Sequence, residues 1–146
     1  MTERVAADIT QQILLALNYM HKQKMMHRDL KPENMLVQDL ADTLKVNVKL
    51  TDFGFATTWK AGEKLDLSLG SPLYMAPELV NELAYDNRVD VWSVGVIVYI
   101  LLSGAPPFVG NDKEEIYEAI VSAPLNFGNK FARVSNEAKD FIRLCL

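Results

Sequence analysis

Two short segments of the chain carry side chains that could bind a phosphate and a divalent cation. In the first, Asp29, Lys31 and Asn34 lie close together in sequence, and in the second, Asp52 follows a run with β-branched residues. Asn34 and Asp52 offer hard oxygen atoms of the kind that Mg²⁺ prefers. Asp29 adds a further carboxylate, and Lys31 adds a positive charge two residues after it.

Each of these residues also has a simpler explanation when it is taken alone. The two aspartates could be solvated loop carboxylates, and Asn34 could be an Asx-turn residue. Lys31 could be an ordinary surface lysine. The neighbouring residues favour the chemical interpretation, because they form the ordered segments His27-Arg28-Asp29-Leu30-Lys31-Pro32-Glu33-Asn34 and Asp52-Phe53-Gly54.

Local sequence patterns predict the elements that position these segments. Apolar residues at helical spacing from Thr2 to about Gln23 predict a long amphipathic helix with Thr2 as its N-cap. Residues 35–37 and 46–51 contain β-branched side chains and predict two short paired strands. That pairing would bring the two segments with oxygen ligands together.

The rest of the chain predicts a loop and further helices. Residues 57–73 follow neither the helix period nor the strand period and predict a long mobile loop. Residues 91–102 are almost continuously apolar, with Asp90 before them and Gly104 after them as start and stop signals. A helix there would rise about 18 Å, short of the roughly 30 Å hydrocarbon core of a bilayer, so we expect it to be buried in a globular core. Two more helices are expected, over residues 112–121 and after an N-cap at Ser135.

Composition and charge narrow the possible classes of protein. The chain has 146 residues, 49% of them hydrophobic and 23% charged, which fits one globular domain. Its net charge of −4 argues against binding to nucleic acid or to an anionic membrane surface. The single cysteine, Cys145, cannot form an internal disulfide, and the N-terminus does not resemble a signal peptide. We therefore expect an intracellular, cytoplasmic location.

The ordered motifs resemble those of the eukaryotic protein kinases. The first segment follows their catalytic-loop pattern H-R-D-x-x-x-x-N, Asp52-Phe53-Gly54 follows a predicted strand, and Ala76-Pro77-Glu78 closes the long loop. The resemblance continues through Asp90-Val91-Trp92-Ser93-Val94-Gly95 and residues 104–108, so it covers essentially the whole chain. It implies an α+β, mostly helical fold, namely a kinase C-terminal lobe with a small two-stranded β element.

The resemblance also indicates a class of kinase. Lys31-Pro32-Glu33-Asn34 and residues 70–74 follow the serine/threonine version of the pattern and differ from the tyrosine-kinase version. Residues 107–108 and 136–143 are most similar to the calcium/calmodulin-dependent and calcium-dependent kinase group. The implied reaction is transfer of the ATP γ-phosphate to serine or threonine hydroxyls of proteins.

The family pattern implies roles for the residues with candidate chemistry. Asp29 matches the catalytic base, and Lys31 matches the cation that steadies the transferred phosphate of ATP. Asn34 and Asp52 match the ligands of Mg²⁺. Leu36 resembles the apolar floor beneath the adenine ring, although it could equally be a half-buried strand residue, and both can hold.

Three residues match positions that bind the protein substrate. Ser71 resembles the hydroxyl residue that bridges Asp29 and Lys31, with an exposed loop serine as the alternative. Glu33 and Glu118 match acidic positions that pair with an arginine upstream of the phosphorylated residue. For Glu118, a solvated helix face is an equally good explanation.

Regulation is implied by Arg28, because kinases with this Arg-Asp pair resemble those in which a loop phosphate binds the arginine. Leu67 stands where many relatives carry a phosphorylatable threonine. Ser68 is the leading candidate phosphosite, with Thr57, Thr58 and Ser71 as alternatives.

Other residues of the motifs are expected to be structural. His27 and Phe53 resemble two members of the hydrophobic spine, and Glu78 is expected to pair with an arginine beyond the end of the chain. Asp90 could be a buried anchor of the catalytic loop, a helix N-cap, or both. His21 is expected to be structural or solvated, and Trp92 is expected to pack in the core.

Parts of the kinase pattern are missing from the sequence. No glycine-rich phosphate loop, strand lysine or partner glutamate precedes the first predicted helix. We therefore expect residues 1–146 to form a partial kinase domain without its N-terminal lobe and its C-terminal end. We also expect negligible turnover alone, ATP and protein substrates as partners of the completed domain, and exposed apolar residues near Leu36 and Phe53. The alternative is a kinase-like module that binds partners without catalysis.

Overall fold

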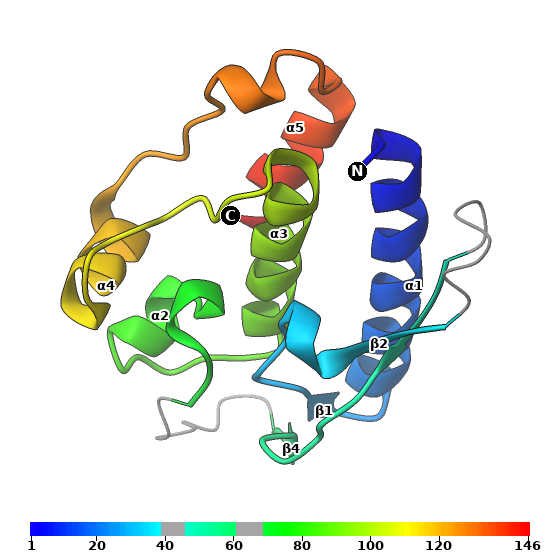
Figure 1. Cartoon of the computed structure of the whole chain (residues 1–146). Helices are drawn as coiled ribbons and strands as arrows, with labels where there is room; N and C mark the ends of the chain where they lie inside the picture. The colour runs from blue at the N-terminus through cyan, green and yellow to red at the C-terminus, as the bar shows by residue number, and fades with distance from the viewer. Residues whose placement is uncertain (39–45, 61–68) are drawn as a thin grey trace.

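The computed structural model describes residues 1–38, 46–60 and 69–146, and this part of the chain is mostly helical (Figure 1). Its helices are α1 (Glu3–Lys22), α2 (Pro77–Val80), α3 (Arg88–Ser103), α4 (Lys113–Ser122) and α5 (Asn136–Cys145). Its strands are β1 (Met25–Met26), β2 (Met35–Gln38), β3 (Asn47–Leu50) and β4 (Thr57–Thr58). The predicted α+β, mostly helical fold is confirmed.

Helix α3 forms the centre of the molecule. In Figure 1 it stands between α1 on one side and α2 and α4 on the other, and α5 crosses its C-terminal half. Buried residues cover all sides of α3, with Val94, Val96 and Ile97 at most 1% exposed. A helix that is apolar on every face must be enclosed by other elements, as predicted from residues 91–102. No helix in the described ranges combines the length and the apolar character needed to cross a bilayer.

The start of α3 differs from the sequence prediction. The helix begins at Arg88, one turn earlier than expected, and its N-cap residue is Asn87. Asp90 therefore lies inside the first turn, and the N-cap interpretation of Asp90 was wrong. The predicted stop is confirmed, because Gly104 adopts a left-handed φ of 74° and its N–H donates to the carbonyl of Ile100.

Helix α1 packs one apolar face on α3 and holds β3 with a polar side chain. Thr2 caps it as predicted, its hydroxyl accepting from the N–H of Val5 at 3.4 Å. The Gln12 amide clamps the third strand, since its Nε2 donates to the carbonyl of Val46 (2.8 Å) and its Oε1 accepts from the N–H of Val48 (2.9 Å). This clamp fixes the position of β3 beside α1.

The strand pair predicted over residues 35–37 and 46–51 is confirmed. Strands β2 and β3 run antiparallel with Met35 opposite Leu50, and the N–H of Thr51 donates to the carbonyl of Asn34 at 2.9 Å. The sheet therefore brings the end of the first motif beside the start of the second.

A second small sheet was not predicted. Strands β1 and β4 pair antiparallel, so Thr57 and Thr58 belong to a strand and not to the expected loop over 57–73. Two residues are too few to show a strand period in sequence. The part of that loop at residues 61–68 lies outside the described residues, so its predicted mobility stays a prediction.

The last two long helices begin as predicted. The Asp112 carboxylate accepts from the N–H of Glu115 at 2.8 Å at the start of α4. Ser135 accepts from the N–H of Ala138 at 3.1 Å at the start of α5. Helix α5 then crosses α3 so closely that a methyl group on Gly95 would lie 2.6 Å from Cβ of Cys145.

This close approach predicts that Gly95→Ala destabilises the fold. Overpacking costs about 1–3 kcal/mol, whereas the better helix propensity of alanine returns about 1 kcal/mol, so we expect a net loss of up to about 2 kcal/mol in the free energy of unfolding. Urea unfolding measures it. Gly128→Ala is the matched control, because Gly128 has φ −66° and nothing within 4 Å of an added Cβ. It should gain about 0.4–1 kcal/mol, and equal losses in both variants would contradict the α3–α5 explanation.

Candidate active site

The loop that carries Asp29 is anchored to helix α3 by the carboxylate of Asp90. Asp90 is fully buried, and its two oxygens accept from the backbone N–H groups of His27 and Arg28, each at 2.9 Å. Arg28 adopts a left-handed φ of 69°, which residues other than glycine seldom do. Because both neighbouring amides are bonded to one buried carboxylate, the strained turn before Asp29 has a fixed shape.

His21 supports the same carboxylate from helix α1. Its Nε2 lies 2.8 Å from Asp90 Oδ2, and its Nδ1 lies 3.0 Å from the side-chain nitrogen of Asn87. Since the Asn87 nitrogen donates, the network assigns Nδ1 as the acceptor and Nε2–H as the donor to Asp90. The His21 ring also meets the Trp59 ring edge-on at 5.9 Å between centroids. Of the two alternatives for His21, the structure supports the structural one.

The carboxylate of Asp29 collects donors from three residues. Asp29 is 4% exposed, and Lys31 Nζ donates to its Oδ2 at 2.8 Å. The backbone N–H and the hydroxyl of Ser71 lie 3.0 and 3.1 Å from its Oδ1. The Asn34 amide nitrogen lies 3.2 Å from Oδ2 and donates to the Asp29 carbonyl at 2.9 Å. The structure thus brings four of the sequence-predicted site residues into one cluster.

Ser71 also joins the two charged members of this cluster. Lys31 Nζ donates to Ser71 Oγ at 2.9 Å, and that hydroxyl donates to Asp29. Burial acts to raise the pKa of Asp29, but the hydrogen bonds from Lys31 and Ser71 outweigh it and hold this pKa below its ordinary value. Asp29 is therefore ionised near neutral pH and can accept a hydrogen bond from a hydroxyl.

Asp52 lies beside this cluster and faces solvent. It follows β3 with a left-handed φ of 57°, and its exposed carboxylate accepts from the N–H of Gly54 at 3.3 Å. The backbone bond between Thr51 and Asn34 joins its segment to the Asp29 loop. Among the described residues no group of three or more His, Cys, Asp and Glu side chains could hold a metal. The Asn34 amide oxygen and the exposed Asp52 carboxylate still fit Mg²⁺, because this ion commonly takes one or two protein ligands and completes its shell with phosphate and water.

Leu36 and Phe53 are apolar side chains near this cluster and largely open to solvent. Leu36 on β2 is 61% exposed and Phe53 is 51% exposed, which confirms the exposure expected for both. The Phe53 ring contacts the ring of fully buried His27, with 5.3 Å between centroids. Exposed apolar side chains therefore lie directly next to the buried residues beneath the candidate site.

Glu33 borders the Asp29 cluster, whereas Glu118 does not. A pocket of about 460 Å³ is lined by Lys31, Glu33, Asn34, Ser71, Pro72, Leu73 and Tyr74. Burial raises the pKa of Tyr74, and the charge of nearby Glu33 adds to the effect. Glu118 is exposed on α4, the helix whose Tyr117 hydroxyl contacts Met75 Sδ at 3.3 Å. The structure thus brings Glu33, but not Glu118, into this pocket.

The remaining motif residues lie around the cluster. The Arg28 guanidinium donates to the carbonyl of Phe55 (2.7 Å) and to the hydroxyl of Tyr85 (3.1 Å). Ser68 lies outside the described residues. Glu78 on α2 is half-buried and contributes to the raised pKa of Arg88, which is caused mainly by Asp86. Sequence reasoning missed Tyr85 and Trp59, since neither belongs to a recognised motif or a periodic run.

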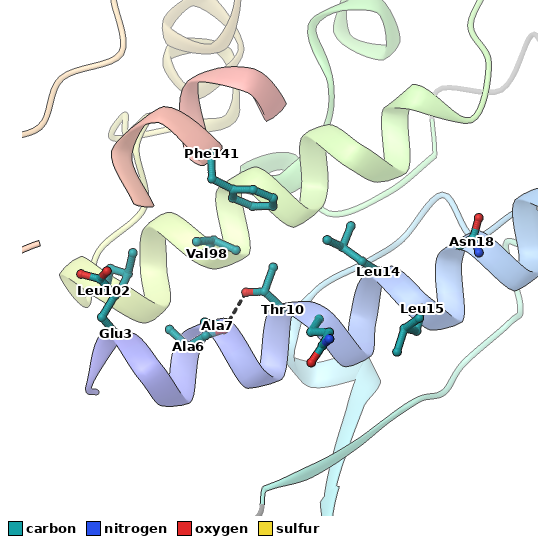
Figure 2. Close-up of a pocket in the computed structure, with 11 residues that line it drawn as sticks. Glu3, Ala6, Ala7, Thr10, Leu14, Leu15, Asn18, Val98, Leu102 and Phe141 are labelled. Atoms are coloured by element: carbon teal, nitrogen blue, oxygen red, sulfur yellow. Dashed lines mark hydrogen bonds between the residues drawn. The ribbon is translucent and has the colours of Figure 1, made fainter. Parts of the chain in front are cut away.

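Another hollow, of about 510 Å³, lies between α1, α3 and α5, away from Asp29 (Figure 2). Its side chains include Leu14, Leu15, Val98, Leu102 and Phe141. Two of the polar residues on its wall have hydrogen-bond partners in the protein: Thr10 donates to the carbonyl of Ala6, and Glu3 accepts from Ser135. This hollow supplies no group for the chemistry of the candidate site.

The mostly helical core with its two small two-stranded sheets is the architecture of a kinase-like C-terminal lobe. The protein kinase domain model matches residues 1–146, so the chain belongs to the protein kinase domain family. The expected similarity to calcium-dependent and related kinases is confirmed by curated relatives.

Three of these relatives show the extent of the match. A probable myosin light chain kinase of Dictyostelium discoideum is 41% identical over 97% of this chain and 40% of its own length. Myosin light chain kinase A of the same organism is 42% identical over 97% of this chain and 48% of its own length. Calcium-dependent protein kinase 32 of Arabidopsis thaliana is 43% identical over 99% of this chain and 27% of its own length. The chain thus spans less than half of the length of each.

The anchoring geometry predicts that Asp90→Asn destabilises the fold. Both Asp90 oxygens accept from backbone N–H groups, so an amide nitrogen at either place would face a donor. Leaving a buried donor unpaired costs about 1–3 kcal/mol in the free energy of unfolding, which urea titration measures. Asp140→Asn is the control: its 2.6 Å pair with Arg143 is more than half exposed on both sides, so its loss should cost less than about 1 kcal/mol.

The Asp29 cluster predicts that Ser71→Ala raises the pKa of Asp29 towards its ordinary value. In the native protein the lowered pKa means that ionised Asp29 stabilises the fold above the unfolded-state pKa, and this contribution is lost as pH falls through the lowered value. Ser71→Ala should bring the folded-state pKa of Asp29 closer to its unfolded-state pKa. The stability contribution of ionised Asp29 should then be smaller, and it should be lost over a narrower pH range. Titration of ¹³C-labelled carboxyl groups by NMR measures the shift. The pKa of Glu3, lowered by Ser135 at a distant site, is the internal control and should not change.

Proposed function

We propose that residues 1–146 form the C-terminal lobe of a serine/threonine protein kinase domain that transfers the ATP γ-phosphate to protein hydroxyls. The observation that carries this proposal is the buried carboxylate of Asp29, which accepts hydrogen bonds from Lys31 and Ser71, while Lys31 also donates to Ser71. An isolated structural aspartate would not need a cation and a hydroxyl arranged around both of its oxygens. The arrangement suits a group that must receive a substrate hydroxyl in one orientation.

In the proposed reaction Asp29 acts on the substrate hydroxyl and Lys31 acts on the phosphate. The Asp29 carboxylate accepts the hydroxyl proton as the substrate oxygen forms its bond to the γ-phosphorus and the bond from that phosphorus to ADP breaks. Lys31 places its ammonium group beside the transferred phosphate, and Ser71 keeps Lys31 and Asp29 in register. Asn34 and Asp52 would hold Mg²⁺, which supplies charge neutralisation to the phosphates when bound.

The nucleotide is proposed to bind over the exposed apolar side of the site. Leu36 would contact the adenine ring, and the surface that includes Phe53 would be covered by the N-terminal lobe of the kinase fold. Both side chains are more than half exposed, which supports an additional layer above them. Without that layer the nucleotide has few contacts, so we expect the isolated chain to have negligible turnover.

Substrate choice and regulation are assigned as further parts of the proposal. Glu33 lines the pocket next to Ser71 and would pair with an arginine upstream of the target residue. Glu118 would extend that recognition along the exposed face of α4. Arg28 is the proposed regulatory contact and Ser68 the candidate phosphosite.

The proposal is tested by joining this chain to the N-terminal lobe of one of the myosin light chain kinase relatives and measuring ATP-dependent phosphorylation of serine peptides. Asp29→Asn should lower kcat by at least about 10²-fold, since it removes the proton acceptor. Asp8→Asn, at an exposed position of α1, is the matched control and should leave kcat unchanged. Equal rates for Asp29→Asn and Asp8→Asn would refute the kinase assignment, and binding without turnover would favour the non-catalytic module.

A further inference from the structure

Arg28 is the residue through which the two halves of the candidate site are tied together. Its backbone N–H is bonded to Asp90 on α3, and its φ of 69° sets the direction in which its side chain leaves the loop. The guanidinium Nε donates to the carbonyl of Phe55 at 2.7 Å. Arg28 precedes Asp29, and Phe55 follows Asp52 by three positions. One side chain therefore spans the segments that carry both carboxylates.

The second contact of the guanidinium is to a buried tyrosine. Nη1 donates to the hydroxyl of Tyr85 at 3.1 Å, and Tyr85 is 7% exposed. Its ring belongs to the same buried cluster as Leu79 of α2 and Val89 of α3. Because packing fixes the ring, the hydroxyl oxygen is held in place before Arg28 reaches it. The tyrosine thus supplies a preorganised acceptor from the chain itself.

The two acceptors that the described residues provide for the Arg28 guanidinium are uncharged oxygen atoms. Within the same part of the chain no carboxylate lies at ion-pair distance from Arg28. The carbonyl of Phe55 and the hydroxyl of Tyr85 therefore orient the guanidinium by hydrogen-bond geometry.

We propose that Tyr85 is a positioning residue that acts through Arg28 and so helps to hold Asp29 and Asp52 in their catalytic arrangement. The proposal rests on the proposed kinase function. It assigns to the Tyr85 hydroxyl and the Phe55 carbonyl the task of setting the guanidinium.

The first experiment measures the geometry in the chain itself, free of phosphate by mass spectrometry. NMR should show a slowly exchanging Nε–H of Arg28 in the wild type and faster exchange in Tyr85→Phe. Tyr99→Phe is the matched control, because Tyr99 is 9% exposed and its hydroxyl donates to the carbonyl of Asn126 at 2.8 Å, outside the candidate site. Tyr99→Phe removes the same kind of buried hydroxyl and should leave the exchange rate of the Arg28 Nε–H unchanged. Unchanged exchange in Tyr85→Phe would overturn the proposal.

The second experiment measures catalysis in the chain joined to an N-terminal lobe. Tyr85→Phe should lower kcat about 10-fold by displacing Arg28, while the KM for ATP stays near the wild-type value. Tyr99→Phe should lower the melting temperature comparably without lowering kcat. A merely structural role for Tyr85 would give the two variants the same kcat, and that result would overturn the proposal.

The wild-type protein distinguishes failure of this proposal from failure of the kinase function on which it rests. If the wild type is inactive and matches Asp29→Asn, the kinase function itself has failed. In that case, the Arg28 exchange measurement still decides whether Tyr85 holds the guanidinium.

Discussion

The bonding of the buried Asp90 carboxylate to the backbone of the loop that carries Asp29 is the constraint on which the candidate site depends. A charged group with no exposure is tolerated only when its oxygens are fully bonded, and here two backbone amides and a histidine provide that bonding. The same bonds hold Arg28 in a left-handed conformation, which residues other than glycine seldom adopt. Helix α3 thus fixes the position of the loop, and with it the position of Asp29, which follows Arg28 in the sequence.

The two carboxylates of the candidate site differ in their exposure to solvent and in their hydrogen-bond partners. Asp29 is nearly buried and its donors come from Lys31, Asn34 and Ser71, so its orientation and charge are set by the protein. Asp52 is exposed, and its carboxylate accepts a local hydrogen bond from the N–H of Gly54. The first is suited to orient one hydroxyl, and the second is suited to meet a ligand that arrives from solvent. The β2–β3 sheet and the hydrogen bond from Thr51 to Asn34 join the segments that carry the two carboxylates.

Sequence reasoning predicted those parts that depend on strong local signals. The long helix after Thr2, the strand pair, the cap Ser135 and the stop at Gly104 each have a local physical cause, and each was confirmed. The helix expected over residues 112–121 was also found, as α4, with Asp112 as its N-cap. The family motifs also located the residues that cluster at Asp29. The short β1–β4 pair escaped because two-residue strands carry no period.

The errors concern contacts between distant segments. An aspartate ahead of an apolar run is typical of an N-cap, but α3 begins one turn earlier, which frees Asp90 to point towards the loop. His21 lies 69 positions from Asp90, and Tyr85 lies 57 positions from Arg28, so no local pattern could connect either pair. Such long-range bonds arise only when the helices pack.

The tight crossing of α3 and α5 also determines how the single cysteine behaves. Burial raises the pKa of the Cys145 thiol to about 11, so the thiolate that reacts with oxidants and alkylating agents is scarce at neutral pH. While α5 stays packed against Gly95, the Cys145 sulfur is therefore unreactive towards these reagents. Reactivity at this position would signal that the last helix has left the core.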